Sequence, residues 1–185
     1  MSVHITYFVH GTTTDNERGL ATGWEPGELS ALGVQQSREL STLVAEQSFD
    51  AVIASDLKRA VDSAELAFGG RYSIVRDARL REANYGEYTW RDETLKQQLT
   101  DHIDTPFPGG ESYRDVERRI RSLLHDLWVN RQHQSVALMA HQAPQLALEV
   151  LLNGKSWSEA IASDWRHTKA WQPGWAYELV GLSAL

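Results

Sequence analysis

The sequence contains no cysteine, which excludes disulfide bonds, zinc sites built on thiolates and a cysteine nucleophile. It also lacks a long hydrophobic run. The first apolar stretch, residues 4–9, is only about six residues long, and a signal peptide or a membrane helix needs more. We therefore expect a cytoplasmic protein without a membrane partner.

A long basic run is absent as well, and the formal net charge is −7 at pH 7. Nucleic-acid affinity depends mainly on clustered lysine and arginine side chains that contact backbone phosphates. The charge balance therefore argues against a nucleic-acid partner. It remains compatible with a small anionic ligand held by a few local cations.

No internal repeat and no low-complexity linker interrupts the 185 residues, of which 42% are hydrophobic and 23% charged. Such a composition is typical of a globular domain with a sizeable core. We predict a single domain over residues 1–185. The sequence leaves the oligomeric state open, and a homodimer is one of the arrangements it allows.

Short apolar strands alternate with amphipathic helices. Strands are predicted over 4–9, 51–54, 72–75 and 135–140, and helices over 30–47, 57–68, 112–130 and 144–153. A short helix is expected around 91–100, and one or two edge strands in 161–182. Ser112 and Asp115 have the spacing of a capping box. The alternation predicts an α/β fold: a three-layer α/β/α sandwich with a mostly parallel central sheet.

Two of these strands lead directly into a histidine. His10 follows the strand at 4–9, and His141 follows the strand at 135–140. In an open α/β sheet, ligands bind at the carboxyl ends of the strands. Two histidines that arrive there from distant parts of the chain indicate one site.

Several segments resemble the motifs of one family, in the order in which that family has them. They are Val9-His10-Gly11 with Asn16, Thr22-Gly23-Trp24, residues 29–37, Ser55-Asp56-Leu57-Lys58-Arg59-Ala60, residues 80–87, residues 108–112 and His141. Over about residues 3–154 the chain resembles the histidine phosphatase superfamily, which includes the phosphoglycerate mutases. The resemblance implies a phosphoglycerate mutase-like fold.

In this family the first histidine attacks phosphorus, so the resemblance implies that His10 is the nucleophile and forms a phosphohistidine. Its ring must be neutral, with one nitrogen facing phosphorus and the other protonated and held by an acceptor. Arg59 and a protonated His141 would donate to the phosphoryl oxygens. Glu82 would protonate the leaving alcohol and then activate water.

Four further positions are expected to contact the phosphate or the substrate: Gly11, Asn16, Thr22 and Gln142. Asn16 and Thr22 would act as neutral donors. The resemblance implies no metal and no cofactor. It implies a small phosphorylated or anionic metabolite as the partner.

Two residues depart from the family's pattern, and each is next to one of the two histidines. Val9 replaces an arginine that binds the phosphoryl group, and Gln142 stands where a glycine is usual. Losing one such donor in a closed site costs about 3–4 kcal/mol of transition-state stabilisation. Another arginine from a loop (Arg18, Arg79 or Arg81) could replace it. Alternatively, the substrate carries its own compensating charge or is not an ordinary phosphomonoester, or the protein is a weak or inactive relative that binds a ligand.

These observations favour a phosphatase that hydrolyses a small phosphorylated metabolite through a phosphohistidine. Mutase activity is less favoured, because the mutases carry longer insertions that enclose the substrate. The first alternative is a catalytically weak or inactive member that binds an anionic metabolite. The second is a metal-dependent hydrolase using His10, Asp15, Glu82 and His141, although no His-x-x-x-His spacing supports it. No Gly-x-Ser-x-Gly elbow of a serine hydrolase occurs.

The tail contains four tryptophans: Trp157, Trp165, Trp171 and Trp175. Packing of the final strands is the preferred explanation for them. A substrate-stacking wall or a dimer face is the alternative.

Overall fold

A five-stranded sheet forms the centre of the computed structural model, which describes residues 1–92 and 98–181. The strands are β1 (Val3–Val9), β2 (Ala51–Ala54), β3 (Ile74–Arg76), β4 (Ser135–Ala140) and β5 (Trp175–Leu179), in the spatial order β3-β2-β4-β1-β5. The first four run parallel, and β5 pairs antiparallel with β1 at the edge. The predicted mostly parallel α/β sandwich is therefore confirmed.

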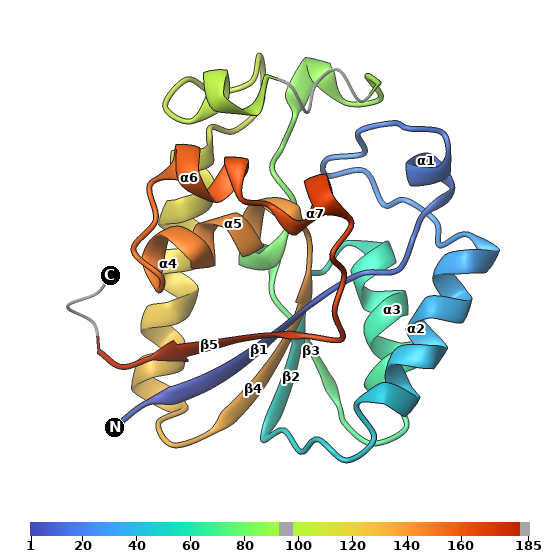
Figure 1. The fold of residues 1–185 in the computed structure, drawn as a ribbon, viewed down its shortest axis with the longest axis vertical. Helices are drawn as coiled ribbons and strands as arrows, with labels where there is room; N and C mark the ends of the chain where they lie inside the picture. Colours follow the sequence, from blue (N-terminus) through green and yellow to red (C-terminus); the bar gives the residue numbers. More distant parts are fainter. Residues whose placement is uncertain (93–97, 182–185) are drawn as a thin grey trace.

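Helices cover both faces of this sheet (Figure 1). The α-helices of the described residues are α1 (Thr14–Glu17), α2 (Ala31–Leu43), α3 (Lys58–Phe68), α4 (Tyr113–Asn130), α5 (Gln142–Leu151), α6 (Trp157–Ala162) and α7 (Trp165–Thr168). Helices α2 and α3 pack on one face, and α4, α5 and α6 pack on the other. In the described residues, 1–92 and 98–181, no helix combines the length and the apolar character that crossing a membrane requires.

The inner strands β2 and β4 are buried on both faces, and successive side chains of β4 belong to different parts of the core. In β4, Val136 and Leu138 join the core on the α4–α5 side, whereas Ala137 and Met139 join the core on the α2–α3 side. Strand residues alternate between faces, so a parallel sheet covered by helices on both sides needs a continuous apolar run. This explains why the apolar residues 135–140 predict a strand.

The connections from β1 and β4 place a crevice between their carboxyl ends. The chain leaves β1 toward α2 on one face of the sheet, and it leaves β4 into α5 on the opposite face (Figure 1). Neighbouring strands whose helices diverge in this way form the ligand-binding crevice of doubly wound sheets. Val9 is paired with Ala140 there, so the next residues, His10 and His141, begin at the same level.

Some predicted boundaries differ from the structure. The helix expected from 144 begins at Gln142, because Pro144 lies in the first turn, where a missing N–H costs nothing. The helix expected over 30–47 ends at Leu43. Residues 93–97 of the helix expected around 91–100 lie outside the described residues, and a short 3₁₀ helix covers Leu99–His102.

The tail contains more helix than the sequence pattern predicted. Within the described part of 161–182, Trp175–Leu179 forms the one edge strand, while the end of α6 and the short helix α7 lie in the first part of this region. Helix α6 begins with a capping box of Ser156 and Glu159, a signal present in the sequence. The capping box of Ser112 and Asp115 at the start of α4 is as predicted.

Two glycines let the loop after β1 pack against α2, backbone to backbone. A Cβ on Gly33 would lie 1.9 Å from the carbonyl oxygen of Thr12, and a Cβ on Gly11 would lie 2.4 Å from the carbonyl oxygen of Gly33. Neither contact is possible for a larger residue without moving the backbone. The position of the segment after β1, which carries His10, thus depends on both glycines.

We expect Gly33→Ala to lower the free energy of unfolding by about 2–3 kcal/mol, because the added methyl group forces α2 away from the loop. Gly70→Ala is the matched control, since a Cβ there meets no atom within 4 Å. Urea unfolding followed by circular dichroism measures both. Equal midpoints for the two variants would contradict the close approach.

Candidate active site

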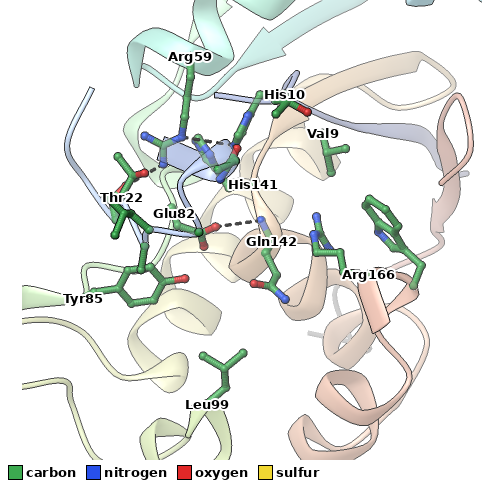
Figure 2. Close-up of a pocket in the computed structure, with 17 residues that line it drawn as sticks. Val9, His10, Thr22, Arg59, Glu82, Tyr85, Leu99, His141, Gln142 and Arg166 are labelled. Carbon is green, nitrogen blue, oxygen red and sulfur yellow. Dashed lines mark hydrogen bonds between the residues drawn. The ribbon is translucent and has the colours of Figure 1, made fainter. Parts of the chain in front are cut away.

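A cavity of about 340 Å³ lies at the carboxyl ends of β1 and β4 (Figure 2). Except for Gly11, every residue predicted for the site lines it: His10, Asn16, Thr22, Arg59, Glu82, His141 and Gln142. Gly11 instead donates its N–H to Ser63 Oγ at 3.0 Å, so that N–H is engaged away from the cavity. The structure therefore brings together residues that are as far apart in the sequence as His10 and Gln142.

His10 is held as one tautomer by its neighbours. Its Nδ1 lies 2.7 Å from the carbonyl oxygen of Gly11, which can only accept a hydrogen bond, so Nδ1 carries the proton. Its Nε2 then has a lone pair, which accepts from Arg59 Nε at 3.3 Å. Burial, with the Arg59 guanidinium as a second cause, lowers the pKa of His10 to about 3. The ring is neutral, and its basic nitrogen borders the cavity.

His141 lies beside it, with ring centroids 5.0 Å apart. The side chain is buried, and neither ring nitrogen has a hydrogen-bond partner among the described residues. Burial, followed by the charge of Arg59, holds the pKa of His141 well below its ordinary value. Unpaired buried polar groups are rare and costly, so this ring is suited to a polar ligand in the cavity.

The backbone of His141 is fixed by Tyr7, which the sequence analysis did not single out. The Tyr7 hydroxyl donates to the His141 carbonyl oxygen at 2.7 Å and accepts from the His141 N–H at 3.0 Å. Tyr7 is fully buried in β1, and burial raises its pKa, so the hydroxyl keeps its proton. A tyrosine within a buried strand gave no sequence signal for this clamp.

Arg59 projects from the first turn of α3 and is almost completely buried. Its Nη1 donates to the carbonyl oxygen of Glu25 at 2.6 Å, and its Nη2 donates to that of Gly23 at 2.8 Å. These bonds tie the loop before α2 to the cavity and aim Nε at His10. Arg59 therefore places a fixed positive charge at the cavity, but the N–H groups that bond the backbone carbonyl oxygens are not available to a ligand.

Glu82 closes the start of α5. Its Oε1 accepts from the N–H groups of Ala83 and Ala143, each at 2.9 Å, and its Oε2 accepts from the N–H of Gln142 at 3.1 Å. The first N–H groups of a helix lack partners within the helix, so this carboxylate satisfies two of them. Trp24 Nε1 donates to the carbonyl oxygen of Glu82 at 2.7 Å and holds its backbone.

Asn16 and Thr22 border the cavity from the loop after β1. The Oδ1 of Asn16 accepts from the N–H of Thr13 in a capping box, so the amide NH₂ of Asn16 takes no part in that turn. Thr22 is buried, and its hydroxyl donates to Asp15 at 3.3 Å. Among residues 1–92 and 98–181, no three His, Asp or Glu side chains are grouped so that they could share a metal ion.

Val9 lines the cavity and brings no donor, and none of the arginines expected to replace it is there. Arg79 is paired with Asp77 and Asp126, and Arg81 with Asp56. These ion pairs hold Arg79 and Arg81 away from the cavity, and Arg18 does not line it either, so the structure gives no support to the explanation that one of these three arginines takes the place.

The cavity wall near Val9 is instead formed by the tail. Trp165 and Arg166 of α7 line it, and neither belongs to the motifs read from the sequence. Trp165 also stacks on Trp175 of β5, with centroids 5.0 Å apart, which supports the packing explanation for these tryptophans. Trp171 is half exposed and lines an adjoining cavity of about 960 Å³.

Comparison with known proteins finds one family for this arrangement. A model of the histidine phosphatase superfamily (branch 1) matches residues 7–173. The 2,3-bisphosphoglycerate-dependent phosphoglycerate mutase of Methylorubrum extorquens (strain PA1) is 28% identical over 172 residues, which cover 83% of this chain and 80% of the mutase.

Two phosphatases are similar as well. The adenosylcobalamin/alpha-ribazole phosphatase of Escherichia coli (strain K12) is 28% identical over 143 residues, which cover 72% of this chain and 70% of that protein. The structure of a mycobacterial glucosyl-3-phosphoglycerate phosphatase in complex with VO3 superposes with a TM-score of 0.73 at 27% identity, over 87% of this chain and 86% of the other.

The low pKa of His10 predicts a pH dependence of stability. Below its ordinary pKa of 6.5 the unfolded chain binds a proton that the folded chain does not bind until about pH 3, so the free energy of unfolding falls as the pH falls through this window. Between pH 7 and pH 5 we expect a loss of up to about 2 kcal/mol from this ring, because the unfolded chain takes up its proton over most of this interval and the folded chain does not.

His10→Gln should remove that part of the loss, as measured by urea unfolding at both pH values. The control is His125→Gln, since His125 is exposed on α4 and should leave the dependence unchanged. An unaltered pH dependence in His10→Gln would contradict the prediction.

Proposed function

Since the chain belongs to branch 1 of the histidine phosphatase superfamily, we propose that it is a metal-independent phosphatase that hydrolyses a small phosphorylated metabolite through a phosphohistidine on His10. Relatives with phosphatase and mutase names support a phosphorylated metabolite as the substrate class. The identity of that metabolite depends on the loops around the cavity, which differ between relatives of this similarity.

One observation carries the proposal. The neutral His10 ring borders the cavity with the lone pair of Nε2, next to a buried His141 ring whose two nitrogens lack partners among the described residues. A nucleophile and an unsatisfied donor site thus lie side by side. In a phosphoryl group bound between them, phosphorus would face the Nε2 lone pair of His10, and an equatorial oxygen would accept a hydrogen bond from a ring N–H of His141.

In the first step, the Nε2 lone pair of His10 attacks phosphorus as the bond from phosphorus to the leaving oxygen breaks. Glu82, protonated at this stage, gives its proton to that oxygen. The Nδ1–H bond to the Gly11 carbonyl oxygen stabilises the positive charge that the ring gains. Arg59 Nε, released from Nε2, donates to a phosphoryl oxygen instead.

In the second step, the ionised Glu82 takes a proton from a water molecule whose oxygen attacks phosphorus. The bond between phosphorus and Nε2 breaks, and inorganic phosphate leaves with the ring neutral again. The bonds from Ala83, Gln142 and Ala143 keep the carboxylate in one place through both steps. Transfer to a second hydroxyl group instead of water would make the protein a mutase, which the similarity to phosphoglycerate mutases makes the second candidate.

His10→Ala should reduce hydrolysis of 4-nitrophenyl phosphate, assayed with a chelator present, by at least about 10³-fold, because the nucleophile is lost. His125→Ala serves as the control, since His125 is exposed and remote from the cavity. Brief incubation of the wild-type protein with labelled substrate should trap an acid-labile phosphoprotein, and His10→Ala should trap none. Equal rates for wild type and His10→Ala would refute the proposal.

Glu82→Gln should slow hydrolysis of an alkyl phosphate by about 10²–10⁴-fold, because a poor leaving group needs the proton. With 4-nitrophenyl phosphate the first step needs no acid, so a burst of about one nitrophenol per protein should precede slow turnover. Glu87→Gln is the matched control: the side chain is exposed, close in sequence and outside the cavity. An equal loss on both substrates without a burst would argue against the acid and base role.

The alternative is a protein that binds an anionic metabolite and does not turn it over, and the absence of a donor at Val9 favours it. Calorimetric binding of inorganic phosphate together with no phosphate release from a panel of phosphate esters would support this alternative. Release of phosphate at catalytic protein concentration would exclude it.

A further inference from the structure

Arg166 reaches the cavity from a part of the chain that carries none of the motifs. It lies on α7, and it lines both the cavity of His10 and the larger adjoining cavity. In Figure 2 it lies on the same side of the cavity as Val9 and Gln142. A long side chain at position 9 would extend into this region, so the short Val9 leaves space for the guanidinium.

Hydrogen bonds to Asp164 and Gln145 fix the guanidinium of Arg166. Its Nη1 donates to Asp164 Oδ1 at 3.0 Å and to Gln145 Oε1 at 3.2 Å, and Nη2 donates to the same Gln145 oxygen at 3.2 Å. The guanidinium also lies over the ring of Trp165, 4.4 Å from its centroid. An arginine has five N–H donors, so these bonds orient the group and leave Nε–H and one hydrogen of Nη2 for a ligand.

Asp164 connects this arginine to the second unusual residue of the site. Its carboxylate is almost completely buried and accepts from Gln142 Nε2 through its other oxygen. Gln142 follows His141 directly, and a glycine in its place would have no side chain to reach Asp164. The two departures from the family's pattern therefore meet at Arg166: Val9 leaves the space, and Gln142 holds the carboxylate that orients the arginine.

We propose that Arg166 binds the phosphoryl group in place of the arginine that Val9 replaces, and that Gln142 and Asp164 are positioning residues for it. The proposal rests on the proposed function insofar as the ligand is a phosphoryl group. Asp164 offsets part of the charge, so Arg166 acts chiefly as a fixed fork of donors opposite Arg59. A guanidinium is suited to this role because its planar donors match phosphate oxygens in pairs.

Binding of inorganic phosphate tests the assignment without requiring turnover. By calorimetry, Arg166→Gln should weaken phosphate binding by about 10- to 100-fold, and Arg166→Lys should have a smaller effect because it keeps the charge and loses the fork. Arg38→Gln, an exposed arginine of α2 that does not line the cavity, should bind as wild type does. Thermal unfolding of each variant shows that it is folded.

Rescue and coupling separate a direct role from a structural one. Val9→Arg should restore phosphate binding in the Arg166→Gln variant, because the arginine returns to the position that the family uses. Gln142→Gly should weaken phosphate binding in the wild-type background and have no further effect in the Arg166→Gln background, since it acts through Arg166.

The outcomes distinguish this assignment from the proposed function. If the wild type hydrolyses no ester yet binds phosphate in a way that depends on Arg166, the proposed function fails and the assignment holds. If Arg166→Gln binds phosphate and hydrolyses 4-nitrophenyl phosphate as the wild type does, the assignment fails alone. A wild type that binds no phosphate also overturns it.

Discussion

Strands β1 and β4 pair in parallel with Val9 opposite Ala140, and this register sets where the groups of the cavity begin. The two strands end at the same level and are followed directly by His10 and His141, whose ring centroids lie 5.0 Å apart. A shift of one residue would turn one histidine to the opposite face of the sheet. The hydroxyl of Tyr7, which bonds both backbone groups of His141, adds a second link between the same strands.

Around this pair, side chains and backbone groups from distant segments satisfy one another almost completely. Arg59 bonds the carbonyl oxygens of the loop before α2, and Glu82 bonds the free N–H groups at the start of α5. Both ring nitrogens of His141 lack a partner among the described residues, as does the buried Tyr113 hydroxyl, and an unpaired buried polar group costs about 1–3 kcal/mol. An anion that hydrogen-bonds the His141 ring would offset this cost, so the same unpaired ring nitrogens that lower the stability of the protein would favour ligand binding.

Val9 and Gln142 acquire a common explanation in this setting. Each by itself is a departure that would weaken phosphate binding or narrow the cavity. Together they accommodate Arg166, since one gives it space and the other holds the Asp164 carboxylate that orients it. In the role proposed for Arg166, all these residues serve the same guanidinium group.

The sequence by itself determined the layered α/β architecture and pointed to seven of the residues that line the cavity. Short continuous apolar runs between amphipathic helices favour buried parallel strands, and local patterns place His10 and His141 after strands and Arg59 in the first turn of a helix. Glu82 lies in an irregular segment, where only its motif pointed to the site. Tertiary structure alone decided the part played by Arg166. Helix α7 spans only Trp165–Thr168, too short for its pattern to predict it, and its place is set by stacking on β5 and by a buried carboxylate. Contacts between residues so distant in the sequence leave no periodic signal, which is why the sequence did not reveal that Arg166 lines the cavity.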